Sequence, residues 1–187
     1  RRVMQTIRLF SPDVEVYSID EAFIDLSKLV GRNVEDEMRQ MRSAVLQWTG
    51  IPISVGIGKT KTLAKLANHY AKKHLDTGGV AVVPEQPDEM FRSVDVGDIW
   101  GIGHKWSQKL RNIGINTAFQ LVNMDAIRVR DSFNIVAMKT VMELQGHTYF
   151  RLEQSPEQRK TLIRSRSFGS PVSTWQELSE AIASHAT

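Results

Sequence analysis

Two short, mainly apolar runs near the start of the chain, with polar residues between them, predict a pair of β-strands. The runs cover residues 14–17 and 23–26 and are rich in β-branched and aromatic residues. The adjacent acids Asp20 and Glu21 lie between them. Because side chains on a regular strand point to alternate faces, a bend or hairpin is needed to bring both carboxylates to one site.

Apolar residues then recur every three or four positions, which predicts an amphipathic helix with one buried stripe. Asn33 is a suitable N-cap, and the acids of the first turn suit the helix dipole. The stripe consists of Val34, Met38, Met41, Val45 and Trp48.

Strands and helices alternate in the next part of the chain, which predicts an α/β unit with helices on one side of a sheet. The predicted elements are a strand over 51–57, a helix from Thr60 or Thr62 to about residue 73, a strand over 80–83, and a short helix that Pro84 opens and that ends near Phe91.

The pattern changes after Val94, where helix signals and glycine turns continue without a convincing strand. We expect helices over 104–113 and 117–124, one after Asp125, and one over 133–144. Thr117 and Gln120 have the spacing of a capping box. This region is predicted to be a small all-helical domain.

The last part of the chain predicts a polar linker followed by a βα piece. We expect a linker over 149–161, a strand over 162–168, and a final helix capped by Thr174. This piece is too short to bury its own core, so we interpret residues 162–187 as the start of a further domain.

Composition is that of a globular protein: 187 residues, 41% hydrophobic and 24% charged, without cysteine. A disulfide framework and a thiolate metal site are excluded. We expect a cytoplasmic protein, because no apolar run has the length of a membrane span and no signal peptide is visible. The chain opens on Arg1 inside an apolar-periodic segment, from which we expect it to be a fragment of a longer protein.

The small net charge of +3 is distributed unevenly. Residues 59–74 contain five lysines and no acid, and residues 159–166 contain four basic residues and no acid. Such clusters indicate a local polyanion contact, although solvated surface lysines are the alternative.

Glycines mark two turns that could approach phosphate. Gly56 and Gly58 stand where a strand turns into the lysine-rich helix, and this turn either presents amides to phosphate or is an ordinary tight connection. Gly101 and Gly103 fit a helix–hairpin–helix, whose amides could grip a DNA phosphate with Lys105 nearby. The histidines have no metal-ligand spacing.

The acid pair is the best candidate for chemistry. Carboxylates at a strand end are hard ligands of the kind that Mg²⁺ accepts together with substrate phosphates. A pair of solvated turn residues is the alternative.

Taken in order, these motifs resemble the Y-family translesion DNA polymerases, and among them the UmuC type to which the catalytic subunit of DNA polymerase V belongs. The resemblance rests on Tyr-Ser-Ile-Asp-Glu-Ala-Phe at 17–23, the strand and helix at 53–69, and Trp-Gly-Ile-Gly at 100–103. The tail at 165–169 is also UmuC-like.

The resemblance implies a multidomain α+β architecture. Residues 1–94 would form an incomplete polymerase palm, 95–148 a helical thumb with a helix-hairpin-helix, 149–161 a linker, and 162–187 the start of the little finger.

The resemblance also implies roles for individual residues. Asp20 and Glu21 would be catalytic carboxylates that bind two Mg²⁺ ions in the complete enzyme, and Lys72 would contact the nucleotide triphosphate. Gly101, Gly103, Lys105 and Lys65 would contact DNA.

The implied enzyme is a DNA-directed DNA polymerase of the SOS response, which adds dNTPs to a primer 3′-hydroxyl on template DNA. A UmuD-type subunit, RecA and the sliding clamp are the implied partners. The family also has an N-terminal strand with another metal-binding Asp, which this chain lacks, so we expect the 187-residue chain alone to be inactive. The alternatives are a non-catalytic helix-hairpin-helix DNA-binding module and a nucleotide cyclase, which would leave the hairpin unexplained.

Overall fold

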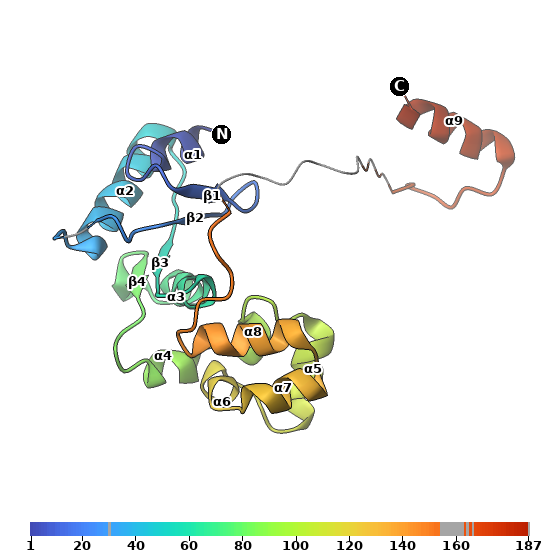
Figure 1. Ribbon diagram of the computed structural model, residues 1–187. Coiled ribbons are helices and arrows are strands. Elements are labelled where there is room, and N and C mark those ends of the chain that lie inside the picture. The colour runs from blue at the N-terminus through green and yellow to red at the C-terminus, as the bar shows by residue number, and fades with distance from the viewer. Residues whose placement is uncertain (30, 154–162, 164, 166, 187) are drawn as a thin grey trace. The chain divides into compact units, whose positions relative to one another are not determined.

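The computed structural model combines helices with two small sheets (Figure 1). It describes residues 1–29, 31–153, 163, 165 and 167–186. The chain divides into two units, Arg1–Gln154 and Ser155–Thr187, and each is described by itself.

The first sheet is the predicted hairpin around the acid pair. Strand β1 (Val14–Val16) pairs antiparallel with β2 (Ala22–Ile24), and Glu15 lies opposite Phe23. The strands are shorter than predicted because Tyr17 already belongs to the turn, where its amide donates to the Glu21 carbonyl over 3.0 Å.

Helix α2 (Val34–Thr49) follows, and the Asn33 side chain caps it as predicted. Its residues Met38, Met41 and Val45 are buried together with α1 (Arg2–Ile7). Trp48, predicted to be buried, is instead 49% exposed, because the hydrophobic cluster that this helix joins ends at Val45.

The second sheet contains the parallel strands β3 (Val55–Ile57) and β4 (Val80–Val82), which α3 (Lys61–Lys73) connects. Among the described residues the strands form two separate two-stranded sheets rather than the single sheet expected. The strand predicted from residue 51 begins only at Val55, and Pro52 in the preceding segment has no amide to give to a ladder.

Close packing of β3 against α3 explains one of the glycine turns. A Cβ on Gly56 would lie 2.1 Å from the Ala64 carbonyl oxygen, and one on Gly58 would lie 2.7 Å from the Ala64 nitrogen. Strand and helix backbones can approach so closely only without side chains between them. The contact favours the interpretation of this turn as a tight connection.

Helix α4 (Asp88–Ser93) follows a 3-10 turn, η1 (Leu75–Thr77), and strand β4. It starts four residues later than predicted. The reason is Pro87, which disfavours a helical conformation in the residue before it and stands at the N-cap of α4.

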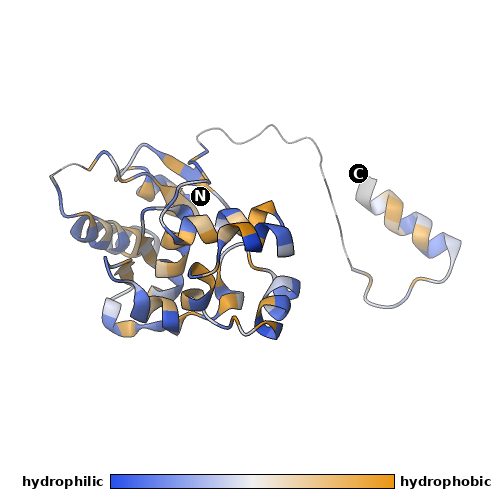
Figure 2. Ribbon diagram, turned by 60° about the horizontal axis from the view of Figure 1, so that its bottom comes forward, coloured by the Kyte–Doolittle hydropathy of each residue, from blue (hydrophilic) through white to orange (hydrophobic). Residues whose placement is uncertain are grey.

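The following region is helical, as predicted, and contains the capping box of Thr117 and Gln120. Its elements are η2 (Val96–Asp98), α5 (His104–Asn112), α6 (Ala118–Val122), α7 (Ala126–Ser132) and α8 (Ile135–Leu144). Their buried side chains join Leu63 and Leu66 of α3 in one hydrophobic cluster. The helices carry both hydrophobic and hydrophilic residues, as expected when one face of a helix packs against the core and the other meets solvent (Figure 2).

In the second unit, Thr174 caps α9 (Trp175–Ala186), because its Oγ1 accepts the Glu177 amide over 3.3 Å. Of the predicted strand, Leu162, Arg164 and Arg166 lie outside the described residues, as do residues 154–161 of the predicted linker. No helix in the described part of the chain is long and apolar enough to span a bilayer.

Candidate acid-pair site

Asp20 stands at the tip of the β1–β2 hairpin with its carboxylate in solvent. The Ser18 hydroxyl donates to Asp20 Oδ1 over 2.6 Å. This hydrogen bond, followed by one from the Asp20 amide and by the charges of Lys72 and Lys65, lowers the pKa of Asp20. Asp20 therefore stays ionised at neutral pH and offers its oxygens to a cation.

Glu21 is turned toward helix α3, where Lys65 Nζ contacts its Oε1 in an ion pair. One helical turn earlier, Lys61 Nζ lies 2.5 Å from Glu15 Oε2 on β1. The two lysines lie four residues apart and hence on one face of α3. They bind the hairpin to the helix through two parallel ion pairs.

The acid pair borders a cavity of about 450 Å³. Lys65 and Lys72 of α3 reach the same cavity, and Met38 and Met41 of α2 lie in its apolar wall. The hairpin and helix α3 thus bring together four of the residues that were predicted to be functional: Asp20, Glu21, Lys65 and Lys72.

The chemistry of this pair fits a hard divalent cation, since Mg²⁺ is often held by one or two carboxylates together with phosphate oxygens. Asp20 is accessible, and the partner of Glu21 is a lysine side chain that can move away. No cluster of three or more His, Cys, Asp or Glu suited to a metal ion occurs in the described residues. The pair therefore supplies only part of a coordination shell, which water or substrate oxygens would complete.

The second predicted site is the glycine turn. Gly101 has φ +88°, and the Ile102 amide closes the turn onto the Ile99 carbonyl over 2.9 Å. Gly103 is exposed at the N-cap of α5, and Lys105 is exposed in the first helical turn. The element before the turn is the short 3-10 helix η2 rather than an α-helix.

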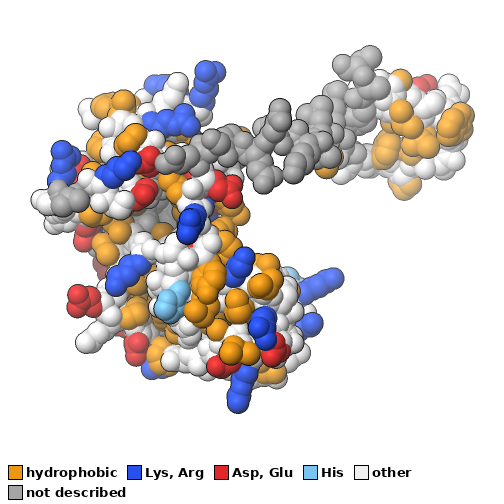
Figure 3. Space-filling model, in the orientation of Figure 1, with side chains coloured by type: hydrophobic (Ala, Val, Ile, Leu, Met, Phe, Trp, Pro, Cys, Tyr) orange, Lys and Arg blue, Asp and Glu red, His pale blue; other side chains and the backbone are white. Residues whose placement is uncertain are grey.

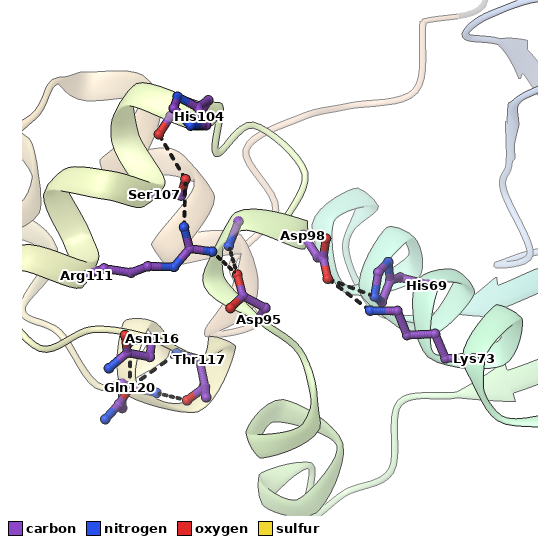
Figure 4. Close-up of polar contacts among 11 residues, drawn as sticks. His69, Lys73, Asp95, Asp98, His104, Ser107, Arg111, Asn116, Thr117 and Gln120 are labelled. Carbon is purple, nitrogen blue, oxygen red and sulfur yellow. Dashed lines mark hydrogen bonds and ion pairs between the residues drawn. The ribbon is translucent and has the colours of Figure 1, made fainter.

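Contacts between charged side chains connect η2 and its N-cap to helix α3 on one side and to helix α5 on the other (Figure 4). Asp98 Oδ2 lies 3.1 Å from Lys73 Nζ and 3.3 Å from His69 Nε2, both on α3. Asp95 Oδ1 accepts the Gly97 amide over 2.7 Å and lies 2.5 Å from Arg111 Nη2 on α5. The start of the glycine turn is thereby positioned relative to the lysine helix.

An aromatic cluster, which the sequence did not predict, connects the two motifs. Trp100 packs edge-on to Tyr17, with ring centroids 5.7 Å apart, and its Nε1 donates to the Tyr17 hydroxyl over 3.2 Å. Its ring also lies 5.6 Å from Phe23 and 5.3 Å from Phe150. Tyr17 and Trp100 each belong to a recognised motif, but nothing in the sequence pairs them.

Glu143 is the other important residue that sequence reasoning missed. Its side chain is 0% exposed. Oε2 accepts the amide and the hydroxyl of Thr62, each over 3.0 Å, and Oε1 accepts the amides of Tyr149 and Phe150 over 2.9 and 2.8 Å. Glu143 lies three residues after Thr140, which is also buried, so the two side chains share one face of α8. No pattern in the sequence marks either of them as buried.

Basic side chains form no single patch on the face in Figure 3. Lysines and arginines are spread over the visible surface of the Arg1–Gln154 unit, with apolar and acidic groups between them. Several lysines of the predicted cluster are held in ion pairs, Lys61 and Lys65 among them. The second predicted cluster, residues 159–166, lies almost wholly outside the described residues.

Comparison with known proteins gives consistent matches. The model of the impB/mucB/samB family matches residues 1–69. The chain is 40% identical over 189 residues to protein UmuC of Salmonella typhimurium, covering 99% of this chain and 45% of that protein. It is 35% identical over 188 residues to MucB of Escherichia coli, with the same coverage. The chain thus spans less than half the length of these relatives.

Solved structures share the fold. The insertion ternary complex of Dbh DNA polymerase matches with a TM-score of 0.64 and 22% identity, over 79% of this chain and 44% of that one. DinB from Sulfolobus solfataricus matches with a TM-score of 0.64 and 23% identity, over 82% and 45%. At this identity the likeness establishes the architecture alone.

Proposed function

We propose that this chain, which is similar to UmuC and MucB over nearly its whole length, belongs to the UmuC-type (impB/mucB/samB) branch of the Y family and is the part of an error-prone translesion DNA polymerase that carries the metal-binding acid pair and a DNA-binding turn. The reaction assigned to the whole enzyme is template-directed addition of a dNTP to a primer 3′-hydroxyl, by two-metal phosphoryl transfer. The observation that carries the proposal is the convergence of Asp20, Glu21 and Lys72 on one cavity.

Each residue has a role suited to its position. Asp20 and Glu21 would hold Mg²⁺ through their carboxylate oxygens. Bound there, Mg²⁺ supplies positive charge that offsets the negative charge of the reacting phosphates. Lys72 is exposed at the end of α3 and would orient the triphosphate of the incoming nucleotide. Positioning and charge stabilisation dominate in phosphoryl transfer, so these residues need supply no covalent chemistry.

We assign duplex binding to the glycine turn and the start of α5. Gly101 and Gly103 are exposed and have no side chain that would keep a phosphate away from the backbone, and the exposed Lys105 adds charge beside them. Contacts of this kind address phosphates and carry no sequence information. Bulky residues at Gly101 and Gly103 are expected to weaken binding to all duplex sequences alike, and a sequence-dependent loss in binding assays would contradict the assignment.

For the domains of this chain we propose a palm over 1–94, a helical thumb over 95–148, a linker over 149–161 and the start of a little finger over 162–187. A UmuD-type subunit, RecA and the sliding clamp are proposed as partners of the whole enzyme from its family alone.

The decisive test uses the full-length protein that contains this segment. Asp20→Ala is expected to abolish primer extension and to retain duplex binding, because the carboxylate serves chemistry and not the grip on DNA. If synthesis continues, the proposed catalytic role is wrong.

The isolated chain offers a second test. We expect the purified 187-residue chain to give no extension with Mg²⁺ and dNTPs, because its described residues provide a pair of carboxylates rather than a full set of ligands. Retained duplex binding by the same chain would mean that, by itself, it acts as a non-catalytic DNA-binding module. Templated extension would contradict this expectation.

A further inference from the structure

Lys65 was expected to contact DNA, but its ammonium group is already bound to Glu21. We infer that Lys65 is an internal counter-ion of the acid pair, which a divalent cation must displace from Glu21 when it binds. The inference rests on the proposed function of Asp20 and Glu21 as a metal site, and it adds a residue that controls access to that site.

The geometry indicates that Lys65 and a metal ion would compete for the carboxylate oxygens of Glu21. Lys65 Nζ contacts Glu21 Oε1 directly, and the side chains are 21% and 29% exposed. A metal ion that used the Glu21 carboxylate would lie within a few ångströms of this ammonium. At such a distance two positive charges repel strongly in a half-buried environment. Binding of the metal to the Glu21 carboxylate therefore disfavours the ion pair with Lys65.

The acid pair already has cationic neighbours without a metal. Asp20 and Glu21 contribute two negative charges to the lining of the cavity, and Lys65, Lys72 and Arg1 contribute three positive charges. Release of Lys65 would free a cation on a flexible four-carbon stem next to the arriving metal. The released Lys65 ammonium could then bind the phosphates that accompany the metal. Displacement of Lys65 by the metal would therefore make this lysine available to bind an anion.

Lys61 provides a matched control one turn away on the same helix face. It also pairs with a glutamate, but both side chains are only 11% exposed, and Lys61 Nζ lies 4.8 Å from the centroid of the Phe23 ring. Its partner Glu15 additionally accepts the amide of Glu153 over 2.6 Å. Removal of Lys61 takes away the same charge without freeing an oxygen of the acid pair.

The experiment measures Mn²⁺ binding to the 187-residue chain by the loss of the free-ion signal in electron paramagnetic resonance. Lys65→Gln is expected to tighten Mn²⁺ binding by about tenfold, as removal of a competing charge at a half-exposed carboxylate should. Lys61→Gln should change the affinity less than about twofold, since its charge is more distant. Unchanged or weaker Mn²⁺ binding by folded Lys65→Gln would overturn the inference.

Asp20→Asn separates this inference from the proposed function. If Asp20→Asn removes the Mn²⁺ affinity while Lys65→Gln leaves it unchanged, the metal site stands and the counter-ion role fails. If Asp20→Asn has no effect on Mn²⁺ binding, the metal site itself is wrong and the inference falls with it.

A measurement on the wild-type chain removes any dependence on the folding of the variants. The ¹H–¹⁵N signal of the Lys65 ammonium should be shifted by its ion pair and should move toward that of a free lysine as Mg²⁺ is added. The Lys61 signal should stay in place. A Lys65 signal that does not respond to saturating Mg²⁺ contradicts displacement.

Discussion

Two carboxylate sites in this chain differ in nearly every physical respect. Glu143 is completely buried, and its four hydrogen bonds come from three backbone amides and one hydroxyl. The pair Asp20 and Glu21 lies at a hairpin tip beside a cavity, and its charged partners are lysine side chains. The first site is surrounded by groups that cannot leave. The second is surrounded by groups that can.

The contrast indicates how to distinguish a structural carboxylate from one available for ligands. Backbone donors hold Glu143 between the start of α3 and the segment after α8, and exchange of a partner would leave a buried charge without compensation. An exposed acid with mobile cationic partners can exchange them for a metal at little cost. Partner type and burial therefore separate the two roles better than the residue type does.

The largest expected effect breaks the structural site. Glu143→Ala leaves the buried amide of Thr62 and the part-buried amides of Tyr149 and Phe150 without acceptors, and should lower the free energy of unfolding by about 3–5 kcal/mol. Urea unfolding measures this. Asp131→Asn, in an exposed ion pair, is the control and should stay within about 0.5 kcal/mol. A loss below about 1 kcal/mol for Glu143→Ala would show that these hydrogen bonds are dispensable.

An intermediate effect concerns the aromatic cluster. Trp100→Ala removes ring contacts with Tyr17, Phe23 and Phe150, and should cost about 2–3 kcal/mol of unfolding free energy. Trp100→Phe should recover part of this loss, because it keeps an aromatic ring but not the hydrogen bond to Tyr17. Equal losses in both variants would shift the importance from packing to that hydrogen bond.

A smaller effect tests an intermediate carboxylate, Asp95, which has one backbone donor and one arginine partner. The Gly97 amide, and to a lesser degree Arg111, lower its pKa in the folded chain. A lowered pKa gives stability that is present above the pKa of the unfolded chain and is lost as pH falls through the folded pKa. Asp95→Asn should therefore be less stable than the wild type at pH 7, by well under about 1 kcal/mol at this exposure.

The measurement for Asp95 is urea unfolding at pH 7 and in acid. The difference between wild type and Asp95→Asn should shrink as the pH is lowered below about 4. A difference that stays constant over this range would contradict a role for the ionised carboxylate.

The smallest stability effect is expected at the acid pair. Asp20→Asn should leave the free energy of unfolding nearly unchanged, because it is a surface substitution outside the core. Thermal unfolding of the two chains checks this. A large destabilisation would give Asp20 the structural role that we assign to Glu143.

Local patterns predicted most of the elements. Asn33 and Thr117 were found as caps because a cap is recognised within three residues of the helix start, and the β1–β2 hairpin was found from two runs of β-branched and aromatic residues around a short turn. Element ends were less accurate where proline acts, as at Pro52 and Pro87.

The contacts that build the candidate site could not be predicted from local patterns. Thr62 and Glu143 are 81 residues apart, Tyr17 and Trp100 are 83 apart, and Glu21 and Lys65 are 44 apart. A single sequence has no local signal for such pairs. This is why the ion pair of Lys65 with Glu21 was not predicted and Glu143 was overlooked, although the motifs at 17–23 and 53–69 were recognised.

Paramagnetic mapping of the 187-residue chain tests most directly whether the acid pair, unlike Glu143, binds metal. Substoichiometric Mn²⁺ broadens the amide NMR signals near each place where it binds. We predict broadening that is centred on Asp20 and Glu21 and extends to Lys72. The signals of Tyr149 and Phe150, beside Glu143, should be unaffected. Broadening centred on another part of the chain, with the acid pair unchanged, would contradict the assignment of Asp20 and Glu21 as the exchangeable, metal-binding carboxylates.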